Sequence, residues 1–201
     1  MSKVLRFAAV VLLSSMVNLA IECELRAQSY GVTADMTSQD LGNGTFDYTI
    51  HLRNDASASV SINTFWFAWV PNIYGYDLMP SAPSVTQSPA GWYPYVINSP
   101  YYYPDGYSIE FYNSGGPALN PGQTFTFEFT SADSPTTLGQ NSPYFGAPTL
   151  TSFAYATYPG YDSGEEFVVS MTPAPEPSTL GLMLASAIAL GMDRQRRKRS
   201  S

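Results

Sequence analysis

Thr45–Leu52, with the sequence TFDYTIHL, alternates polar and apolar side chains without a break. This period of two predicts a β-strand with one buried face and one face in water. Asn43-Gly44 directly precedes it and suits a tight turn that needs positive φ. We therefore predict that residues 30–37 and 45–52 form a β-hairpin.

The same pattern predicts further short strands at residues 107–112 and 123–130, and later ones at 149–157 and 166–172. Residues 60–70 are apolar on both faces, with Trp66 on one face and Trp69 on the other. This indicates a strand buried on each side or one with an aromatic outer surface. Residues 73–104 are expected to be a long irregular region with one short strand at 95–98. No window has a helical period, so the body is predicted to be all-β: a single antiparallel β-sandwich of jelly-roll or Ig-like type.

The amino-terminal end has the layout of a secretory signal peptide. Lys3 and Arg6 precede an apolar run over residues 7–21, and cleavage is expected after Ala27. Cys23 leaves a lipoprotein open as an alternative, although the preceding Glu22 disfavours it. Cleavage after Ala27 would remove this single cysteine, leaving no thiol nucleophile, disulfide or cysteine metal site.

The carboxyl-terminal end, residues 173–201, is predicted to be a separate segment following a sandwich body at residues 28–172. Its prolines are incompatible with a continuing helix or central strand. Residues 178–192 then form an apolar helix pattern about 22 Å long, short for a bilayer core of about 30 Å. The alternatives are an amphipathic core helix with a disordered basic end, or a nucleic-acid-binding tail. By the positive-inside rule, a basic cluster would hold this short transmembrane helix with the body outside the cytoplasm; its members are Arg194, Arg196, Arg197, Lys198 and Arg199.

Pro175-Glu176-Pro177-Ser178, the apolar segment and the Arg-rich end together resemble the PEP-CTERM sorting domain of Gram-negative bacteria. The resemblance implies that an exosortase, an integral-membrane transpeptidase, recognises these four residues as a sorting motif. They would be substrate, not catalytic, residues. Signal peptidase would be the second processing enzyme. We expect transient anchoring in the inner membrane, followed by display at the cell surface or release outside the cell.

The body is strongly acidic. Between residues 28 and 177, one basic residue, Arg53, stands against thirteen Asp and Glu, for a formal charge of −12. A body of this charge repels phosphate backbones, so nucleic-acid binding is excluded as a function class. It could attract basic partners or divalent cations.

Few residues qualify for a chemical site. His51 is the only histidine and is predicted to face solvent from a strand, so neither a zinc site nor a serine-histidine-aspartate arrangement is expected. Asp162, Glu165 and Glu166 surround a Gly-containing turn and are a weak calcium candidate, with a solvated turn as the alternative. No cofactor is predicted. Loop aromatics could contact sugar rings or protein partners, or could simply cover the open end of the sandwich; they are Trp92, Tyr93, Tyr95, Tyr101, Tyr102 and Tyr103.

We therefore expect a non-enzymatic, exported protein of the cell surface or extracellular matrix, associated with a biofilm or exopolysaccharide. The alternative is a secreted carbohydrate-binding β-sandwich module that uses the loop aromatics. A secreted hydrolase would need paired carboxylates in a cleft. Glu110 and Glu128 sit at alternating strand positions and do not require that interpretation.

Overall fold

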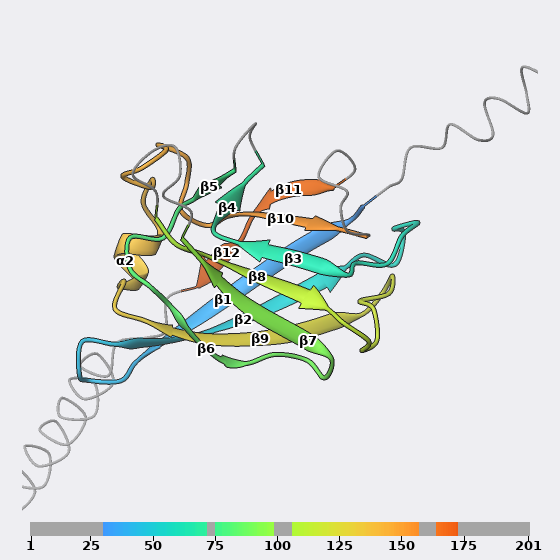
Figure 1. Cartoon of the computed structure of the whole chain (residues 1–201), viewed down its shortest axis with the longest axis horizontal. Coiled ribbons are helices and arrows are strands. Elements are labelled where there is room, and N and C mark those ends of the chain that lie inside the picture. Colours follow the sequence, from blue (N-terminus) through green and yellow to red (C-terminus); the bar gives the residue numbers. More distant parts are fainter. Residues whose placement is uncertain (1–29, 72–74, 99–105, 157–163, 173–201) are drawn as a thin grey trace, which may run out of the picture.

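The computed structural model describes residues 30–71, 75–98, 106–156 and 164–172. They form two packed five-stranded sheets, which confirms the predicted all-β sandwich (Figure 1). The first sheet has the order β12 (Ser170–Thr172), β1 (Val32–Asp40), β2 (Phe46–Asn54), β9 (Thr124–Ser131), β6 (Ser84–Gln87). The second sheet has the order β11 (Glu165–Val168), β10 (Thr151–Tyr155), β3 (Thr64–Phe67), β8 (Ser108–Asn113), β7 (Trp92–Ile97).

Two smaller elements complete the described part of the chain. Strands β4 (Trp69–Val70) and β5 (Tyr76–Asp77) pair with each other outside the two large sheets. A single helical turn, α2 (Pro135–Leu138), is capped at its N-terminus by Ser134, whose side chain accepts a hydrogen bond from the Thr137 N–H. No periodicity predicted this turn, because a single turn is too short to show one.

The predicted hairpin is confirmed. Strands β1 and β2 pair antiparallel along their whole length, from Val32 opposite Asn54 to Asp40 opposite Phe46. Gly44 in the connecting turn has φ of 80°. The Asn43 side chain accepts the Thr45 N–H at 3.0 Å. The Asn-Gly sequence therefore provides both the positive φ and the local hydrogen bond of the turn.

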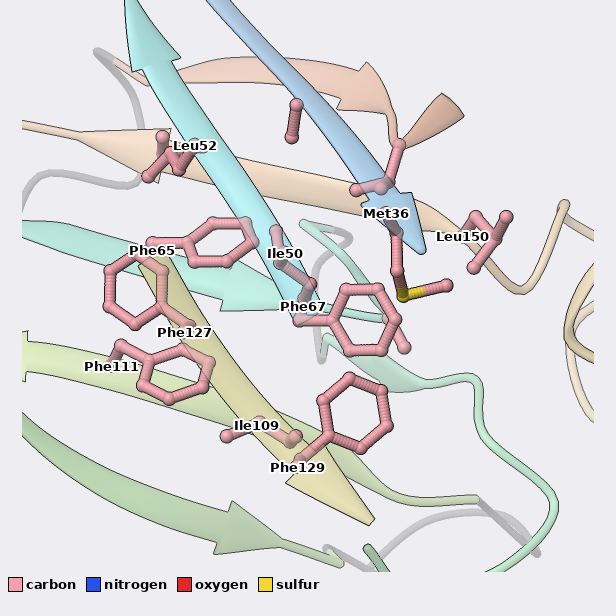
Figure 2. Packing of buried hydrophobic residues seen from close by; sticks show 14 of the residues in the cluster. Met36, Ile50, Leu52, Phe65, Phe67, Ile109, Phe111, Phe127, Phe129 and Leu150 are labelled. Carbon is pink, nitrogen blue, oxygen red and sulfur yellow. The ribbon is translucent and has the colours of Figure 1, made fainter. Parts of the chain in front are cut away.

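The core lies between the inward faces of the two sheets and is dominated by phenylalanine (Figure 2). Phe127 of the first sheet lies between Phe65 and Phe111 of the second, with ring centroids at 5.5 and 4.4 Å. Phe67 and Phe129 form a second pair across the gap at 5.1 Å. These rings occupy alternate positions of β3, β8 and β9. For β8 and β9, the period of two in the sequence predicted this alternation.

Residues 60–70 depart from simple alternation at one position. Ala68 has φ of 57° and separates β3 from β4. This local turn of the backbone brings Trp66 and Trp69 to the same side, where their rings stack at 4.6 Å. The prediction that the two tryptophans lie on opposite faces is therefore wrong. The prediction of a strand buried on each side holds, since every residue of β3 and β4 is buried.

Two other segments hold more strands than expected. Residues 73–104 contain β5, β6 and β7, and β7 spans the whole of residues 92–97. Residues 166–172 cover most of two strands, because the chain crosses from the second sheet to the first at the buried residue Val169. Strand β12 then pairs parallel to β1, whereas the other pairs of named strands are antiparallel.

Candidate functional site

The outer face of the second sheet carries two rows of side chains that cross neighbouring strands. The strand register places these residues side by side, and alternation directs them away from the core. The first row, from β11 to β7, is Glu166, Phe153, Trp66, Glu110 and Tyr95. The second row, from β10 to β7, is Tyr155, Thr64, Tyr112 and Tyr93. We call these nine residues the outer face.

One half of the outer face belongs to a compact aromatic cluster, which Trp69 of β4 completes. Trp66, Trp69, Phe153 and Tyr155 are all buried, and Ile97 packs against them. The Trp66 indole N–H donates to the Tyr155 hydroxyl at 3.3 Å. The Trp69 and Phe153 rings meet at 5.7 Å in an edge-on arrangement. These rings form a second apolar layer, outside the sandwich core.

Glycine backbone approaches this aromatic cluster at two points. A Cβ atom on Gly164 would lie 2.2 Å from Cζ of Phe153, and one on Gly75 would lie 2.9 Å from Nε1 of Trp69. Gly75 also has φ of 67°, which disfavours any residue with a side chain. Glycine is therefore needed at both points for the chain to lie against the rings.

The other half of the outer face is open. Tyr93 and Tyr95 on β7 are 53% and 52% exposed, which is high for aromatic side chains on a strand. Tyr112 lies opposite Tyr93, and Glu110 lies opposite Tyr95. An exposed group of large side chains with flat rings beside a carboxylate is a candidate contact surface. We call these four residues the tyrosine–glutamate patch.

The backbone of β7 is poorly suited to pairing with another strand, although β7 is an edge strand. The Trp92 N–H donates to Pro89 O at 2.9 Å, and the Trp92 carbonyl accepts the Ser88 hydroxyl at 2.8 Å. Pro94, two residues on, has no N–H to offer. Proteins protect sheet edges in this way. A partner at this edge would therefore contact side chains, not backbone groups.

Glu110 occupies the boundary between the covered and the open halves. Its register neighbours in the row are Trp66 on β3 and Tyr95 on β7. Burial raises the pKa of the Glu110 carboxyl above its ordinary value of 4.5. In the second row, the fully buried Thr64 hydroxyl has no hydrogen-bond partner among the described residues. Polar groups on this face are thus held in surroundings that do not stabilise them.

The structure divides the predicted loop aromatics. Trp92 is 3% exposed, meets Phe125 and Phe127 edge-on in the core, and donates its indole N–H to Pro117 O at 2.9 Å. The prediction that Trp92 contacts a glycan or partner is therefore wrong. Tyr93 and Tyr95 have the exposure that such a contact requires. Tyr101, Tyr102 and Tyr103 lie outside the described residues.

The predicted calcium ligands do not converge in the part that is described. Glu165 and Glu166 are consecutive on β11 and so point to opposite faces. The Glu165 carboxylate accepts the Val32 N–H at 3.1 Å, which gives it a structural role. Asp162 lies outside the described residues. Within the described ranges no three histidine, cysteine or acidic side chains gather as a metal site would require.

His51 lies on the outer face of the first sheet, as predicted. Its Nδ1 is 3.1 Å from the Thr126 hydroxyl oxygen, and the ring is partly buried. Glu128 points outward from the same sheet, two positions along β9 from Thr126. Within the described ranges, neither residue belongs to a group of three or more histidine, cysteine or acidic side chains that could hold a metal ion.

The spacing of carboxylates on the outer face does not suit glycoside hydrolysis. Glu110 and Glu166 share a row but are separated by three inter-strand steps. At about 4.8 Å per step, they stand about 14 Å apart. Paired catalytic carboxylates lie within about 9.5 Å of each other. Phe153 and Trp66 also stand between these two acids in the row, so Glu110 and Glu166 are not a neighbouring carboxylate pair.

Both predicted terminal signals lie beyond the described ranges. This applies to the signal peptide at residues 1–27, to the sorting motif at Pro175, Glu176, Pro177 and Ser178, and to the basic cluster. In the portion of the chain that the structure describes, no helix is long and apolar enough to span a membrane.

Comparison with known proteins assigns the chain to no family. Neither a known protein family nor a curated protein matches the chain. One solved structure with distant similarity is a GH20 exo-β-N-acetylglucosaminidase from Vibrio harveyi in complex with N-acetylglucosamine, with a TM-score of 0.39 and 12% identity. The match covers 73% of this chain but only 19% of that enzyme. The chain therefore spans about a fifth of the enzyme's length.

Proposed function

We propose that this chain is an exported, non-enzymatic protein of the cell surface or extracellular matrix. The observation that carries the proposal is the carboxyl-terminal order of Pro-Glu-Pro motif, apolar segment and basic cluster. The last strand of the first sheet ends at Thr172, immediately before this segment. An exosortase acting near Pro175 would therefore find its substrate sequence directly after the sandwich body.

Intact-mass measurement of the protein from its native host tests this proposal. The expected mature chain lacks the signal peptide and the residues from Arg194 onward. A mature protein that retains Arg194–Arg199 contradicts processing by an exosortase. A protein found only in the cytoplasm contradicts export altogether.

A second function, carbohydrate binding, is favoured by the tyrosine–glutamate patch. Two half-exposed tyrosines on one strand, next to a carboxylate, provide flat apolar surfaces and a hydrogen-bond acceptor for a sugar. The two functions are compatible, because a matrix protein could bind the polysaccharide around it.

Glycan-array binding by Tyr95→Ala tests the second function. We expect loss of any glycan signal, because the variant removes an exposed ring without opening the core. Trp92→Ala does not test it, since the removal of this buried indole destabilises the core. An array signal that Tyr95→Ala leaves intact would place carbohydrate binding elsewhere on the molecule.

A further inference from the structure

We propose that the tyrosine–glutamate patch binds a polysaccharide that carries free amino groups. This inference rests on the second proposed function and names its substrate class. The patch consists of Tyr93 and Tyr95 on β7 with Tyr112 and Glu110 on β8.

The two exposed rings favour a chain of sugars over a single small group. Tyr93 and Tyr95 are two residues apart on one strand and so stand about 6.6 Å apart along it. Both project from the same face of a paired strand, which fixes their backbone positions. Rigid flat rings in series give apolar contact area at a small loss of conformational entropy. Successive pyranose rings can lie against such a series.

Charge favours an amino-bearing ligand. Arg53 is the only Lys or Arg between residues 28 and 177, and it lies on β2 of the first sheet, 3.2 Å from Asp55. The second sheet therefore has no Lys or Arg to pair with Glu110. Glu166, in the same row, adds a second negative charge. This face would repel anionic polysaccharides and attract ammonium groups, which also interact favourably with aromatic rings.

The surroundings of Glu110 point in the same direction. The carboxyl is partly buried next to the position of Trp66, and burial raises its pKa, so the charged form is unfavourable in the free protein. An ammonium group on the ligand would supply the missing counter-charge and a charge-assisted hydrogen bond. Groups with perturbed pKa values cluster at functional sites.

The observations favour this ligand over a protein strand. The β7 edge has a proline in place of a donor and the Trp92 backbone groups are already paired, so strand addition gains few hydrogen bonds. A basic peptide could still use the same charge. It is therefore included below as an outcome that overturns the proposal.

Isothermal titration of the full-length chain, kept in mild detergent because of its apolar ends, tests the proposal with three probes. A glucosamine oligosaccharide provides rings and ammonium groups. The matching N-acetylglucosamine oligosaccharide provides rings alone, and an oligolysine of equal charge provides ammonium groups alone. We expect the glucosamine oligosaccharide to bind at least about tenfold more tightly than either, because only it uses both the rings and Glu110.

Variants locate the binding. Glu110→Gln and Tyr95→Ala should each weaken glucosamine-oligosaccharide binding about tenfold or more, whereas Tyr95→Phe should retain it because the ring remains. Glu128→Gln is the matched control: it removes the same charge from the first sheet and should leave binding unchanged.

Three outcomes overturn the proposal. Oligolysine that binds as tightly would identify a surface for basic peptides. Equal binding of the N-acetylated probe would show that Glu110 plays no part in recognition, and absence of sugar binding would exclude the patch as a glycan site. None of these outcomes affects export and sorting, which the mature mass tests separately.

Discussion

The two sheets share one core but differ on their outer faces. The outer face of the first sheet is polar. One row across β1, β2 and β9, for example, consists of Asp35, His51 and Thr126. The corresponding face of the second sheet carries Phe153, Trp66 and Tyr95 in one row. A sandwich needs only its inward faces to be apolar. The aromatic residues of the second sheet's outer face therefore exceed what the fold requires, and function is best sought there.

The largest effect should come from the shared core. Phe127→Ala removes the ring that contacts Phe65 and Phe111, and should lower the free energy of unfolding by about 4 kcal/mol. Thr124→Ala, on the exposed face of the same strand, should change it by less than about 0.5 kcal/mol. Chemical denaturation measures both. Similar effects at the two positions would contradict the assignment of inward and outward faces on β9.

The next largest effect compares the two outer faces directly. Trp66→Ala removes a ring that stacks on Trp69, and should lower the free energy of unfolding by about 3 kcal/mol. His51→Ala, on the first sheet, loses one side-chain contact and should lower it by about 1 kcal/mol or less. A Trp66 effect as small as that of His51 would mean that the aromatic cluster does not act as a second core.

A smaller, pH-dependent effect should follow Glu110→Gln. A carboxyl with a raised folded pKa makes the folded protein less stable as pH rises above the unfolded value, near 4.5. Glu110→Gln should therefore raise the melting temperature at pH 7, and this gain should shrink as pH falls toward 4.5. Parallel melting curves of wild type and variant over this pH range measure it.

Two other carboxylates of the same sheet region, Glu166 and Asp77, remain in both proteins. Glu166 lies in the same row, three strands away on β11, and Asp77 accepts the hydroxyl proton of Ser108 on β8. Their effect cancels in the comparison. A variant that is less stable than wild type at pH 7 would show that Glu110 contributes a favourable contact.

The smallest effect concerns calcium. Glu165 and Glu166 point to opposite faces of β11, so we expect EDTA to leave the melting temperature unchanged. Titration of calcium chloride into the chelated protein is the complementary measurement. A rise in melting temperature that saturates with calcium would show that Glu165 or Glu166 joins ligands beyond the described residues.

The sequence predicts the strands that have one buried face, because alternation depends on burial. Thr45–Leu52 and the phenylalanines of β9 are of this kind. The break at Ala68 is not predicted. Its positive φ interrupts the strand, but residues 65–70 are a continuous apolar run in the sequence and give no sign of a break. Strand β7 escapes because Pro94 suggests a loop, although an edge strand tolerates proline.

The sequence predicts the candidate site only in part, because the site depends on how neighbouring strands align. Tyr93 and Tyr95 were among the aromatic candidates, but Trp92 beside them belongs to the core. The sequence alone shows Glu110 only as one acid at an alternating strand position. Its position between Trp66 and Tyr95 depends on how β3, β8 and β7 align, and that pairing of residues far apart in sequence is not visible in local patterns.

The parallel pairing of β1 and β12 has a mechanical consequence. The two strands run side by side, with Thr37 opposite Thr172, so the chain enters and leaves the sandwich at opposite ends (Figure 1). Tension applied between the two ends would slide β12 along β1. The ladder hydrogen bonds would then share the load instead of opening one at a time. A force that pulls the start of β1 away from the end of β12 therefore loads this strand pair in shear.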